Sequence, residues 1–524
     1  MRQLSTPGVY VNEIDSFSSN VVAVQTAVPV FIGYTEYAKN GNQSLTNVPQ
    51  AISSMAEFLT FYAAPDSASS GAPRATFAYS TKAMTFPPCA FDSANPRFNL
   101  FYGMQLFFAN GGSNCYVLSI GSYADAITNG TSPADYAKCF STLEQSAEPT
   151  MVVMPDAVLL DAAEWKSVSQ QALIHCQKMQ SRVAILDVWQ GYYPPDRTAT
   201  DPIQGSDGES GFYTIGGLGE DFNQYGAAYY PWINANIVAQ SAIDFTWISA
   251  ATFGQFVADM GNEATTVLFP PVNSQTNPRL AAYQSVLADM LQPAPDELSD
   301  PARLLAVDKV HETLNKLSPL YMQTMAKLCT SVNLLPPSSA MAGVYTRIDN
   351  TIGVFQSPAN TTIVSAVSPA VSLSDSQQGE LNIPPNGLAV NAIRSFPNHG
   401  LLVWGARTLA GNSDDWRYIS VRRTTIMLEQ SIKHAMQGYV FQSNDSITWA
   451  AVQSMIANFL QQQWIMGALQ GAKPADAFSV AIGLGSTMTG QDILDGIMNV
   501  VVKVAVVRPA EFIVLTFRQQ MATS

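Results

Sequence analysis

The feature that most constrains the fold is an alternation of strand-like and helix-like segments in the first half of the chain. Three short runs, at residues 114–121, 150–157 and 182–188, are rich in β-branched and other apolar residues. A helical stretch, residues 161–180, lies between the second and the third run. A strand, a helix and a strand in this order predict a βαβ unit, and therefore a largely parallel sheet that helices cover. We expect residues 229–233 to continue this sheet.

Other segments of the first 400 residues do not share this alternation. Residues 41–100 and 191–222 are rich in Ser, Pro, Gly and Asn, a composition typical of surface loops or insertions. Residues 302–333 have a helical pattern, and we expect a kink before Pro319 because proline disfavours a helical residue in front of it.

Residues 401–524 are more regular. Two helices are predicted, at 423–437 and 446–470, the first ended by Gly438 and the second by Gly471 and Pro474. The apolar stripe of the longer helix includes Trp449, Val452, Ile456, Phe459 and Leu460. Two β-rich runs follow, at 500–507 and 511–517. This order of elements indicates a C-terminal region of the α+β class.

Both ends of the chain are predicted to be strands. The run "TPGVYVNEI" at residues 6–14 alternates in the manner of a strand, and the polar stretch 15–20 separates it from the next apolar run. A lone strand is not stable, so this run pairs either with a distant sheet of its own fold or with one in another molecule. At the other end, residues 511–517 are apolar or β-branched on both faces, and we expect them to be covered because such an exposed strand promotes aggregation.

Composition and charge exclude several classes of function. The chain of 524 residues is 47% hydrophobic and only 13% charged, whereas ordinary soluble chains have about 25% charged residues. We therefore expect partners to cover much of its surface. Its net charge of −14 argues against nucleic-acid binding. The five cysteines are scattered without a CxxC spacing, which indicates a reducing compartment and no zinc site. Neither a secretory leader nor a membrane-spanning run is expected.

Several motifs resemble those of the contractile tail sheath proteins of bacteriophages and phage-tail-like injection systems. In chain order they are "PGVYVNE" (7–13), "AVPVFIGYTE" (27–36), "GGSNCYV" (111–117), "AAYYPWI" (227–233), "PPSSAMAGVYTRIDNTIGVFQSPAN" (336–360), "LNIPPNGLAVNAIRSF" (381–396), "VWGARTL" (403–409), "WRYISVRR" (416–423), "GALQGAKPADAF" (467–478) and "VRPAEFIV" (507–514). Departures from the family pattern are Asn12, where an acid is usual, and Phe355-Gln356-Ser357, where Trp-Lys-Ala is common.

This resemblance implies an architecture and a way of assembling. It implies an N-terminal arm and linker at 1–20, a subtilisin-like α/β domain at 21–400 with insertions near 41–100 and 275–335, and an α+β domain at 401–524 near the inner tube. It also implies that both terminal strands are lent to neighbouring subunits. The donor residues are Val9, Tyr10 and Val11 in the arm, and Phe512, Ile513, Val514 and Leu515 within a C-terminal strand at 511–518. The linker residues Asp15, Ser16, Phe17, Ser18, Ser19 and Asn20 then act as a hinge during contraction.

Candidate catalytic and metal-binding residues have a simpler structural interpretation. Asp187, His399 and Ser486 occur in the chain order of the subtilisin triad, but the sequence around them does not match that family, and strand-end capping and loop contacts are the simpler roles. "GLGST" lacks the GK[ST] of a phosphate-binding loop, so we predict a turn. His175 and Cys176 are adjacent on a helix without a further ligand at i+4, which favours packing over metal binding.

Two further groups of residues are candidates for contacts with partners. Arg422 and Arg423 lie at the start of a predicted helix, where arginines form bidentate pairs with carboxylates, and we predict a subunit interface there, with a solvated helix face as the alternative. The aromatic residues Trp449, Phe459 and Trp464 are expected in the core, or else against the inner tube.

The sequence therefore predicts a contractile sheath subunit that is not an enzyme and binds no cofactor and no metal. Its expected partners are further copies of itself, in stacked and by resemblance hexameric rings, an inner tube, a baseplate and terminal caps. Nucleic acid and direct membrane insertion are not expected. We expect assembly in the bacterial cytoplasm as part of a phage tail or a phage-tail-like particle that lysis releases. The alternatives are a subtilisin-like hydrolase and a non-contractile self-assembling shell protein.

Overall fold

The chain divides into two compact units that we describe separately. The computed structural model describes residues 20–64, 76–80, 97–123, 132–205, 211–214, 220–271, 275, 277–291, 301–384 and 387–515. The sheet unit is Thr26–Arg423, and the terminal unit takes both ends of the chain, Met1–Gln25 and Thr424–Ser524. The sheet unit continues past the domain boundary expected at residue 400 because β14 pairs with β13 inside its sheet.

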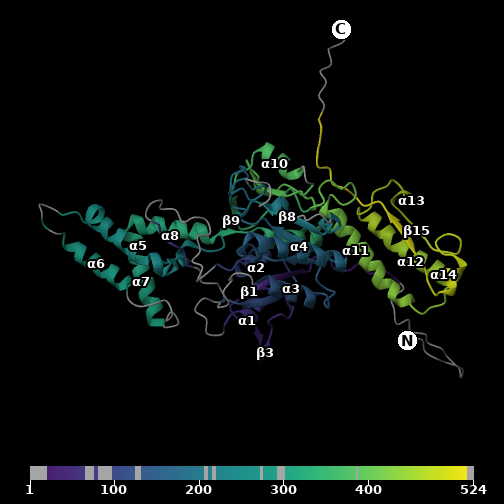
Figure 1. The fold of residues 1–524 in the computed structure, drawn as a ribbon, viewed down its shortest axis with the longest axis horizontal. Helices are drawn as coiled ribbons and strands as arrows, with labels where there is room; N and C mark the ends of the chain where they lie inside the picture. The colour runs from purple at the N-terminus through teal and green to yellow at the C-terminus, as the bar shows by residue number, and fades with distance from the viewer. Residues whose placement is uncertain are drawn as a thin grey trace, which may run out of the picture. The chain divides into compact units, whose positions relative to one another are not determined.

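A nine-stranded sheet forms the centre of the sheet unit (Figure 1). Its order is β11 (Thr361–Thr362), β14 (Gly400–Val403), β13 (Asn391–Phe396), β8 (Gly226–Tyr230), β7 (Val183–Asp187), β6 (Met151–Val153), β1 (Pro29–Thr35), β5 (Cys115–Ser122) and β4 (Gln50–Ile52). The strands from β13 to β5 are parallel. Strands β14 and β4 pair antiparallel with β13 and β5, and β11 pairs antiparallel with β14 at the edge of the sheet. The predicted parallel sheet is thus confirmed.

The central strands are buried along their whole length, as expected for a parallel sheet that is covered on both faces. Every residue of β1, β6, β7 and β8 is buried. The predicted βαβ unit is confirmed, because α4 (Ala162–Met179) connects β6 to β7 and packs on β7. Two further helices, α2 (Leu100–Ala109) and α9 (Ser338–Thr351), pack against each other, and they contact β1 and β7, respectively.

Residues 50–62 are part of this fold, so the prediction of a surface loop over 41–100 is wrong there. Strand β4 forms an edge of the sheet, and α1 (Met55–Tyr62) buries Phe58 and Tyr62. The Tyr62 hydroxyl donates a hydrogen bond to the Val117 carbonyl on β5, at 3.1 Å. A three-residue edge strand is too short to show the alternation by which strands are recognised in a sequence.

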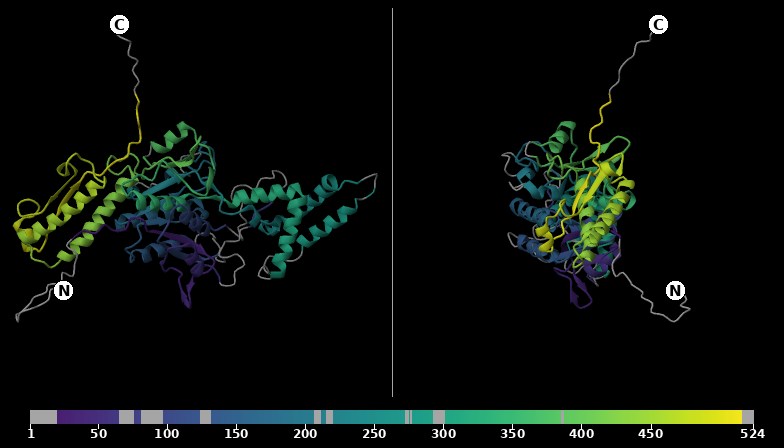
Figure 2. Two further views of the ribbon diagram at one scale, coloured as in Figure 1. Left: turned by 180° about the vertical axis from the view of Figure 1, so that it is seen from behind. Right: turned by 90° about the vertical axis from the view of Figure 1, so that its right-hand side faces the viewer.

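Four helices form a second packed group within the sheet unit (Figures 1 and 2). They are α5 (Ala250–Glu263), which runs into a π-helical turn, Ala264–Leu268, then α6 (Pro278–Met290), α7 (Pro301–Leu317) and α8 (Pro319–Val332). The predicted break before Pro319 is confirmed, since Ser318 caps α8 there. The Glu263 carboxylate accepts a hydrogen bond from the Leu320 amide and so also caps α8.

Smaller elements complete the sheet unit. The three-stranded sheet has the order β10 (Leu334–Leu335), β9 (Ile233–Ala235) and β12 (Ala366–Pro369), and β2 (Lys39–Asn40) pairs with β3 (Gln43–Ser44). Helices α3 (Ser132–Leu143) and α10 (Asp375–Asn382) are accompanied by the 3₁₀ turns Ala157–Leu159, Phe212–Thr214, Glu220–Tyr225, Gln240–Ala242 and Phe245–Trp247.

The terminal unit combines helices with a two-stranded antiparallel sheet. Helix α11 (Ile419–Met436) begins in the sheet unit and is followed by a 3₁₀ turn, Gln437–Tyr439, α12 (Ser446–Ile465), α13 (Pro474–Ala477) and α14 (Gly490–Leu494). Strands β15 (Phe478–Ala481) and β16 (Val501–Val504) pair with each other, and α12 packs on β15. Helix α12 ends before the predicted residue 470 because Gly467, at φ 88°, terminates it.

Candidate functional site

The last described residues of the chain expose an apolar run. Phe512, Ile513, Val514 and Leu515 are exposed to 69%, 79%, 86% and 74%. They are extended but belong to no assigned strand, and Figure 1 shows them leading towards the C-terminus. Large apolar side chains that are this exposed and contiguous indicate a surface that a partner covers. The run is therefore a strong candidate for a binding element among the described residues.

The N-terminal donor residues Val9, Tyr10 and Val11 lie outside the described residues. So does the linker, Asp15, Ser16, Phe17, Ser18 and Ser19, except for its last residue, Asn20, which is exposed. The segment that follows belongs to the terminal unit, where the Val24 amide donates a 3.0 Å hydrogen bond to the Ser431 hydroxyl on α11. The described segment after the linker and the C-terminal run thus belong to the same unit.

The small sheet of the terminal unit has two strands, and the segment that continues β16 pairs with residues 468–470, where the Gln470 amide donates to the Ala505 carbonyl and the Val507 amide to the Ala468 carbonyl. The register of β15 on β16 runs from Phe478 opposite Val504 to Ala481 opposite Val501. Within the part of the chain that the structure describes, no third strand joins this sheet. An isolated two-stranded sheet is marginally stable in water, and its unpaired edge amides and carbonyls can accept an added strand. The unit therefore exposes both a strand-like run and a sheet that can receive one.

The predicted core stripe of α12 is confirmed for its aliphatic members and for Phe459. Val452, Ile456, Phe459 and Leu460 are buried. Trp449 and Trp464 are only half-buried, and each indole nitrogen donates a hydrogen bond inside the unit, to the side-chain oxygen of Asn444 and to the Gly471 carbonyl.

Arg422 and Arg423 are buried inside the sheet unit, which corrects the prediction that they bind a neighbouring subunit. The Arg423 guanidinium forms a bidentate pair with Asp349 of the same chain, at 2.9 and 2.6 Å. The Arg422 guanidinium lies 4.5 Å from the ring centres of both Tyr225 and Trp416. The predicted bidentate geometry is present, but its carboxylate comes from α9 of the same chain, and burial keeps both arginines from a partner.

The residues of the proposed triad have other surroundings. The Asp187 carboxylate, at the end of β7, accepts hydrogen bonds from the amide and the hydroxyl of Ser338 at 2.7 and 2.5 Å, so it caps α9. His399 is exposed in the turn between β13 and β14. Ser486 belongs to the terminal unit, where it is exposed in the turn predicted for "GLGST". The structure thus gives Asp187 the strand-end capping role expected from the sequence.

A second buried carboxylate, which the sequence analysis missed, acts in the same way one strand along. Asp156, just after β6, accepts hydrogen bonds from the backbone amides of Tyr34, Asn99 and Leu100 and so caps α2. Burial raises the pKa of Asp156 to about 6 and that of Asp187 to about 7, although their hydrogen bonds act in the opposite direction. An Asp at the end of two successive predicted strands was the signal available in the sequence.

Gly33 on β1 is required by this arrangement. A side chain at this position would collide with the Asp156 carboxylate. The glycine therefore lets the carboxylate approach the strand and cap α2.

His175 and Cys176 are both buried on α4. Burial and the nearby Arg182 lower the pKa of His175 to about 4, and burial raises the pKa of Cys176 to about 12. Both side chains are therefore neutral near pH 7. Among the described residues, no group of three His, Cys, Asp or Glu side chains is arranged to hold a metal ion.

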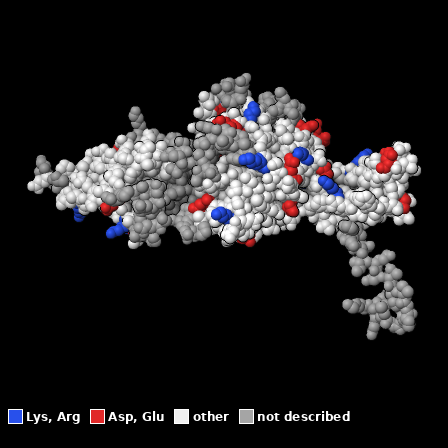
Figure 3. Space-filling view, turned by 60° about the horizontal axis from the view of Figure 1, so that its bottom comes forward, with Lys and Arg blue, Asp and Glu red and all other residues white. Residues whose placement is uncertain are grey.

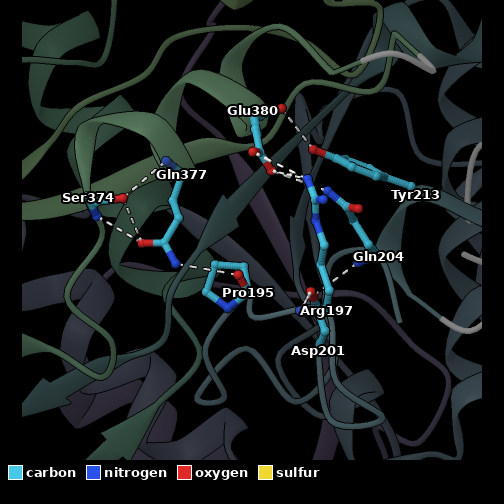
Figure 4. A network of polar contacts seen from close by, with 8 residues as sticks. All are labelled: Pro195, Arg197, Asp201, Gln204, Tyr213, Ser374, Gln377 and Glu380. Atoms are coloured by element: carbon cyan, nitrogen blue, oxygen red, sulfur yellow. Dashed lines mark hydrogen bonds and ion pairs between the residues drawn. The ribbon is translucent and has the colours of Figure 1, made fainter. Parts of the chain in front are cut away.

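A polar cluster outside the core ties a loop to helix α10 (Figure 4). The Glu380 carboxylate lies 3.3 Å from Arg197 and accepts a 3.5 Å hydrogen bond from Gln204, while the Tyr213 hydroxyl donates to the Glu380 carbonyl. Gln377, which forms a capping box with Ser374, reaches the carbonyl of Pro195. Because Glu380 is already paired with a cation, the cluster suits loop anchoring better than proton transfer.

Charged side chains are sparse on the face drawn in Figure 3. Among the described residues on that face, lysine and arginine occur singly or in small groups and form no continuous basic band. This distribution agrees with the net charge of −14 and does not favour a phosphate-backbone contact. No helix in the described part of the chain is long and apolar enough to cross a membrane.

Comparison with known proteins agrees with the motifs of the sequence. Residues 412–520 match the family model of the phage tail sheath C-terminal domain. A search of curated proteins found no match. Among solved structures, the chain is similar to one from the helical sheath of the anti-feeding prophage in the contracted state, with 26% identity, a TM-score of 0.58, and coverage of 99% of this chain and 100% of that one.

Two further structures share the fold. One belongs to the contracted sheath complex of PVC, an extracellular contractile injection system, with 24% identity, a TM-score of 0.57, and coverage of 99% of each chain. The other belongs to the six-fold symmetrised baseplate of the anti-feeding prophage, with 24% identity, a TM-score of 0.58, and coverage of 99% of this chain and 100% of that one. The likeness therefore extends over the whole chain, not only over the matched C-terminal region.

Proposed function

We infer that this chain, which belongs to the contractile tail sheath family, is the structural subunit of a contractile sheath that polymerises helically around an inner tube and contracts to drive the tube through a target envelope. The observation that carries this inference is the end-to-end match to a helical sheath chain, together with the family model over residues 412–520. The parallel sheet of the sheet unit then corresponds to the subtilisin-like domain of the family.

Subunits are linked by exchanged strands in this proposal. Each subunit lends the arm residues Val9–Val11 and the run Phe512–Leu515 to sheets of its neighbours, and the sheet of β15 and β16 is the receiving site. An added strand satisfies edge amides and carbonyls and covers its own apolar side chains. The support is that the C-terminal run is exposed and that the small sheet lacks further strands among the described residues.

Such contacts join different surfaces of successive subunits, so they build an open helix and not a closed dimer. Hexameric rings are the arrangement we propose, in line with the six-fold symmetrised baseplate of the anti-feeding prophage. The further partners are an inner tube, a baseplate and terminal caps. The particle assembles in the bacterial cytoplasm and is released on lysis.

Contraction requires that subunits move while their links persist. Residues 15–20 act as the hinge of the arm, and the extended lattice stores the energy that contraction releases. No catalytic or cofactor site is part of the proposal. A subtilisin-like hydrolase is not favoured, because the Asp187 carboxylate is committed to capping α9 through Ser338.

Negative-stain microscopy of the expressed full chain, combined with a peptide-cleavage assay, tests this function. A sheath subunit forms striated tubes and cleaves no peptide, whereas a hydrolase remains monomeric and active. Tubes in which the spacing between rings stays the same after every treatment that triggers contraction would indicate the non-contractile shell. Monomers under all assembly conditions would contradict the proposal.

A further inference from the structure

The chain passes between its two units at two places, and the side chain of Asp349 in the sheet unit contacts the residue of that unit next to each place. The first passage lies between Gln25 and Thr26, and the second between Arg423 and Thr424. In the sheet unit, the Asp349 carboxylate of α9 accepts a 2.6 Å hydrogen bond from the Thr26 hydroxyl and pairs with the Arg423 guanidinium. The residues next to the two passages, 323 and 74 positions from Asp349, thus meet at one carboxylate.

A direct contact closes this arrangement. The Arg423 guanidinium also donates a 3.0 Å hydrogen bond to the Thr26 carbonyl. The side chains of Arg423 and Asp349 are only 3% and 2% exposed. We call Thr26, Asp349 and Arg423 the clasp, since each of its three members contacts the other two. Its buried hydrogen bonds fix relative positions more strictly than apolar contacts would.

The clasp is connected to the centre of the sheet. The Arg423 guanidinium lies 4.8 Å from the ring centre of Tyr345, one turn before Asp349 on α9. The Tyr345 hydroxyl is 2.7 Å from the Tyr229 hydroxyl on β8, and both tyrosines are fully buried. A force applied at either passage therefore reaches α9 and β8 through closely packed, hydrogen-bonded groups.

The two segments also remain together on the other side of the passages. In the terminal unit, Val24 donates its amide hydrogen bond to Ser431 on α11, the helix that continues from Arg423. The arm and the C-terminal run both belong to this unit. If these are the links between subunits, every pull of the lattice on the sheet unit passes through the residues that the clasp holds.

We propose that the clasp is a mechanical coupling site, which holds the two ends of the sheet unit together so that a pull on either end during contraction is carried by both. The lattice part of this inference rests on the proposed function. The local part, that Asp349 restrains both passages, does not. Apolar residues of similar size often stabilise a fold as well as a buried ion pair does. The fixed geometry of the ion pair, however, suits the coupling of two chain segments.

The test compares Asp349→Asn with Asp414→Asn, which breaks the exposed pair of Asp414 with Arg417 in the same unit. Amide hydrogen exchange is measured on the unassembled full chain. We expect Asp349→Asn to speed exchange by about tenfold or more in residues 20–28 and 419–431, with wild-type rates in β6 and β7. Equal acceleration across the whole sheet unit, or none at the passages, would overturn the local part of the inference.

The second arm uses complete particles that carry the variant sheath. We expect Asp349→Asn particles to assemble but to lose contraction on a trigger that contracts the wild type and Asp414→Asn. Normal contraction would overturn the coupling role. If the wild type itself forms no sheath, the proposed function fails, while the exchange result still decides the local part. If Asp349→Asn does not fold, Thr26→Val replaces it in both experiments. This variant removes only the Thr26 hydroxyl that donates a hydrogen bond to Asp349.

Discussion

The two units differ in how completely each one pairs its own backbone groups in hydrogen bonds and buries its own apolar side chains. In the sheet unit, β6 and β7 are buried throughout, and the acidic residues at their ends, Asp156 and Asp187, cap two helices. In the terminal unit, the sheet of β15 and β16 has only two strands among the described residues, and the run Phe512–Leu515 is exposed. A unit that is complete by itself can act as a rigid body, whereas in the proposed function the incomplete unit provides linkage, because strands of other chains can supply its missing contacts.

The largest expected effect is the loss of assembly when Val514 is replaced with proline. Proline removes the amide hydrogen needed for a strand ladder, at a cost of roughly 3 kcal/mol or more for each subunit if it resembles proline in other regular structure. Because Val514 is 86% exposed in the single chain, we expect folded but unassembled subunits, measured by circular dichroism and sedimentation.

The matched control is Val514→Thr, which keeps the amide and the β-branch and should still assemble. A globally unfolded Val514→Pro chain would place this run in the subunit's own core. Striated tubes at normal yield would show that the run is not a required link.

Removing a strand-end carboxylate should lower the stability of the sheet unit, because buried amides lose their hydrogen-bond acceptor. Asp156→Ala leaves the buried amides of Tyr34, Asn99 and Leu100 without their acceptor, and we expect a loss of about 3 kcal/mol or more in the free energy of unfolding, measured with urea. Asp161→Ala, which removes the exposed cap of α4, should cost only about 1 kcal/mol. Equal losses would mean that burial of the cap is unimportant.

An effect of similar size is expected in the pH dependence of the same unit. The folded pKa of Asp187 is raised to about 7, so its contribution to stability is fully present below its unfolded pKa near 4 and is lost as the pH rises through 7. At about 1.4 kcal/mol per pH unit, this group lowers the free energy of unfolding by as much as about 4 kcal/mol between pH 4 and pH 8.

The variant Asp187→Asn cannot ionise, so its unfolding free energy should fall less over this range than that of the wild type. Any lost hydrogen bond to Ser338 adds a difference that does not depend on pH. Parallel stability profiles for the two proteins, measured by urea unfolding from pH 4 to pH 8, would show that burial of Asp187 does not perturb its titration.

The sequence predicted the sheet unit well where the pattern was local and long. The helix at 161–180 and the strands around it were found from their apolar periodicity, and the break at Pro319 from the chemistry of proline. The three-residue edge strand β4 was missed because it is too short for a periodic signal. Arg423 was assigned to an interface because its partner Asp349 lies 74 residues away, and single-sequence patterns carry no information about such long-range pairs.

The terminal unit was predictable in a different way. Its C-terminal run was recognised as apolar on both faces and therefore in need of cover, and the structure exposes Phe512–Leu515 in the single chain. What covers these residues could not be predicted from the pattern, because an apolar strand pairs as readily within its own fold as with a neighbour. The family motifs supplied that expectation.

The most direct test of the account is a cryo-electron microscopy map of the sheath assembled from this chain. We expect the sheet of β15 and β16 to gain added strands in the assembly, one of them formed by residues 512–515 of a neighbour. A map in which this sheet remains two-stranded, or in which residues 512–515 fold back onto their own subunit, would contradict the claim that the incomplete terminal unit links the lattice.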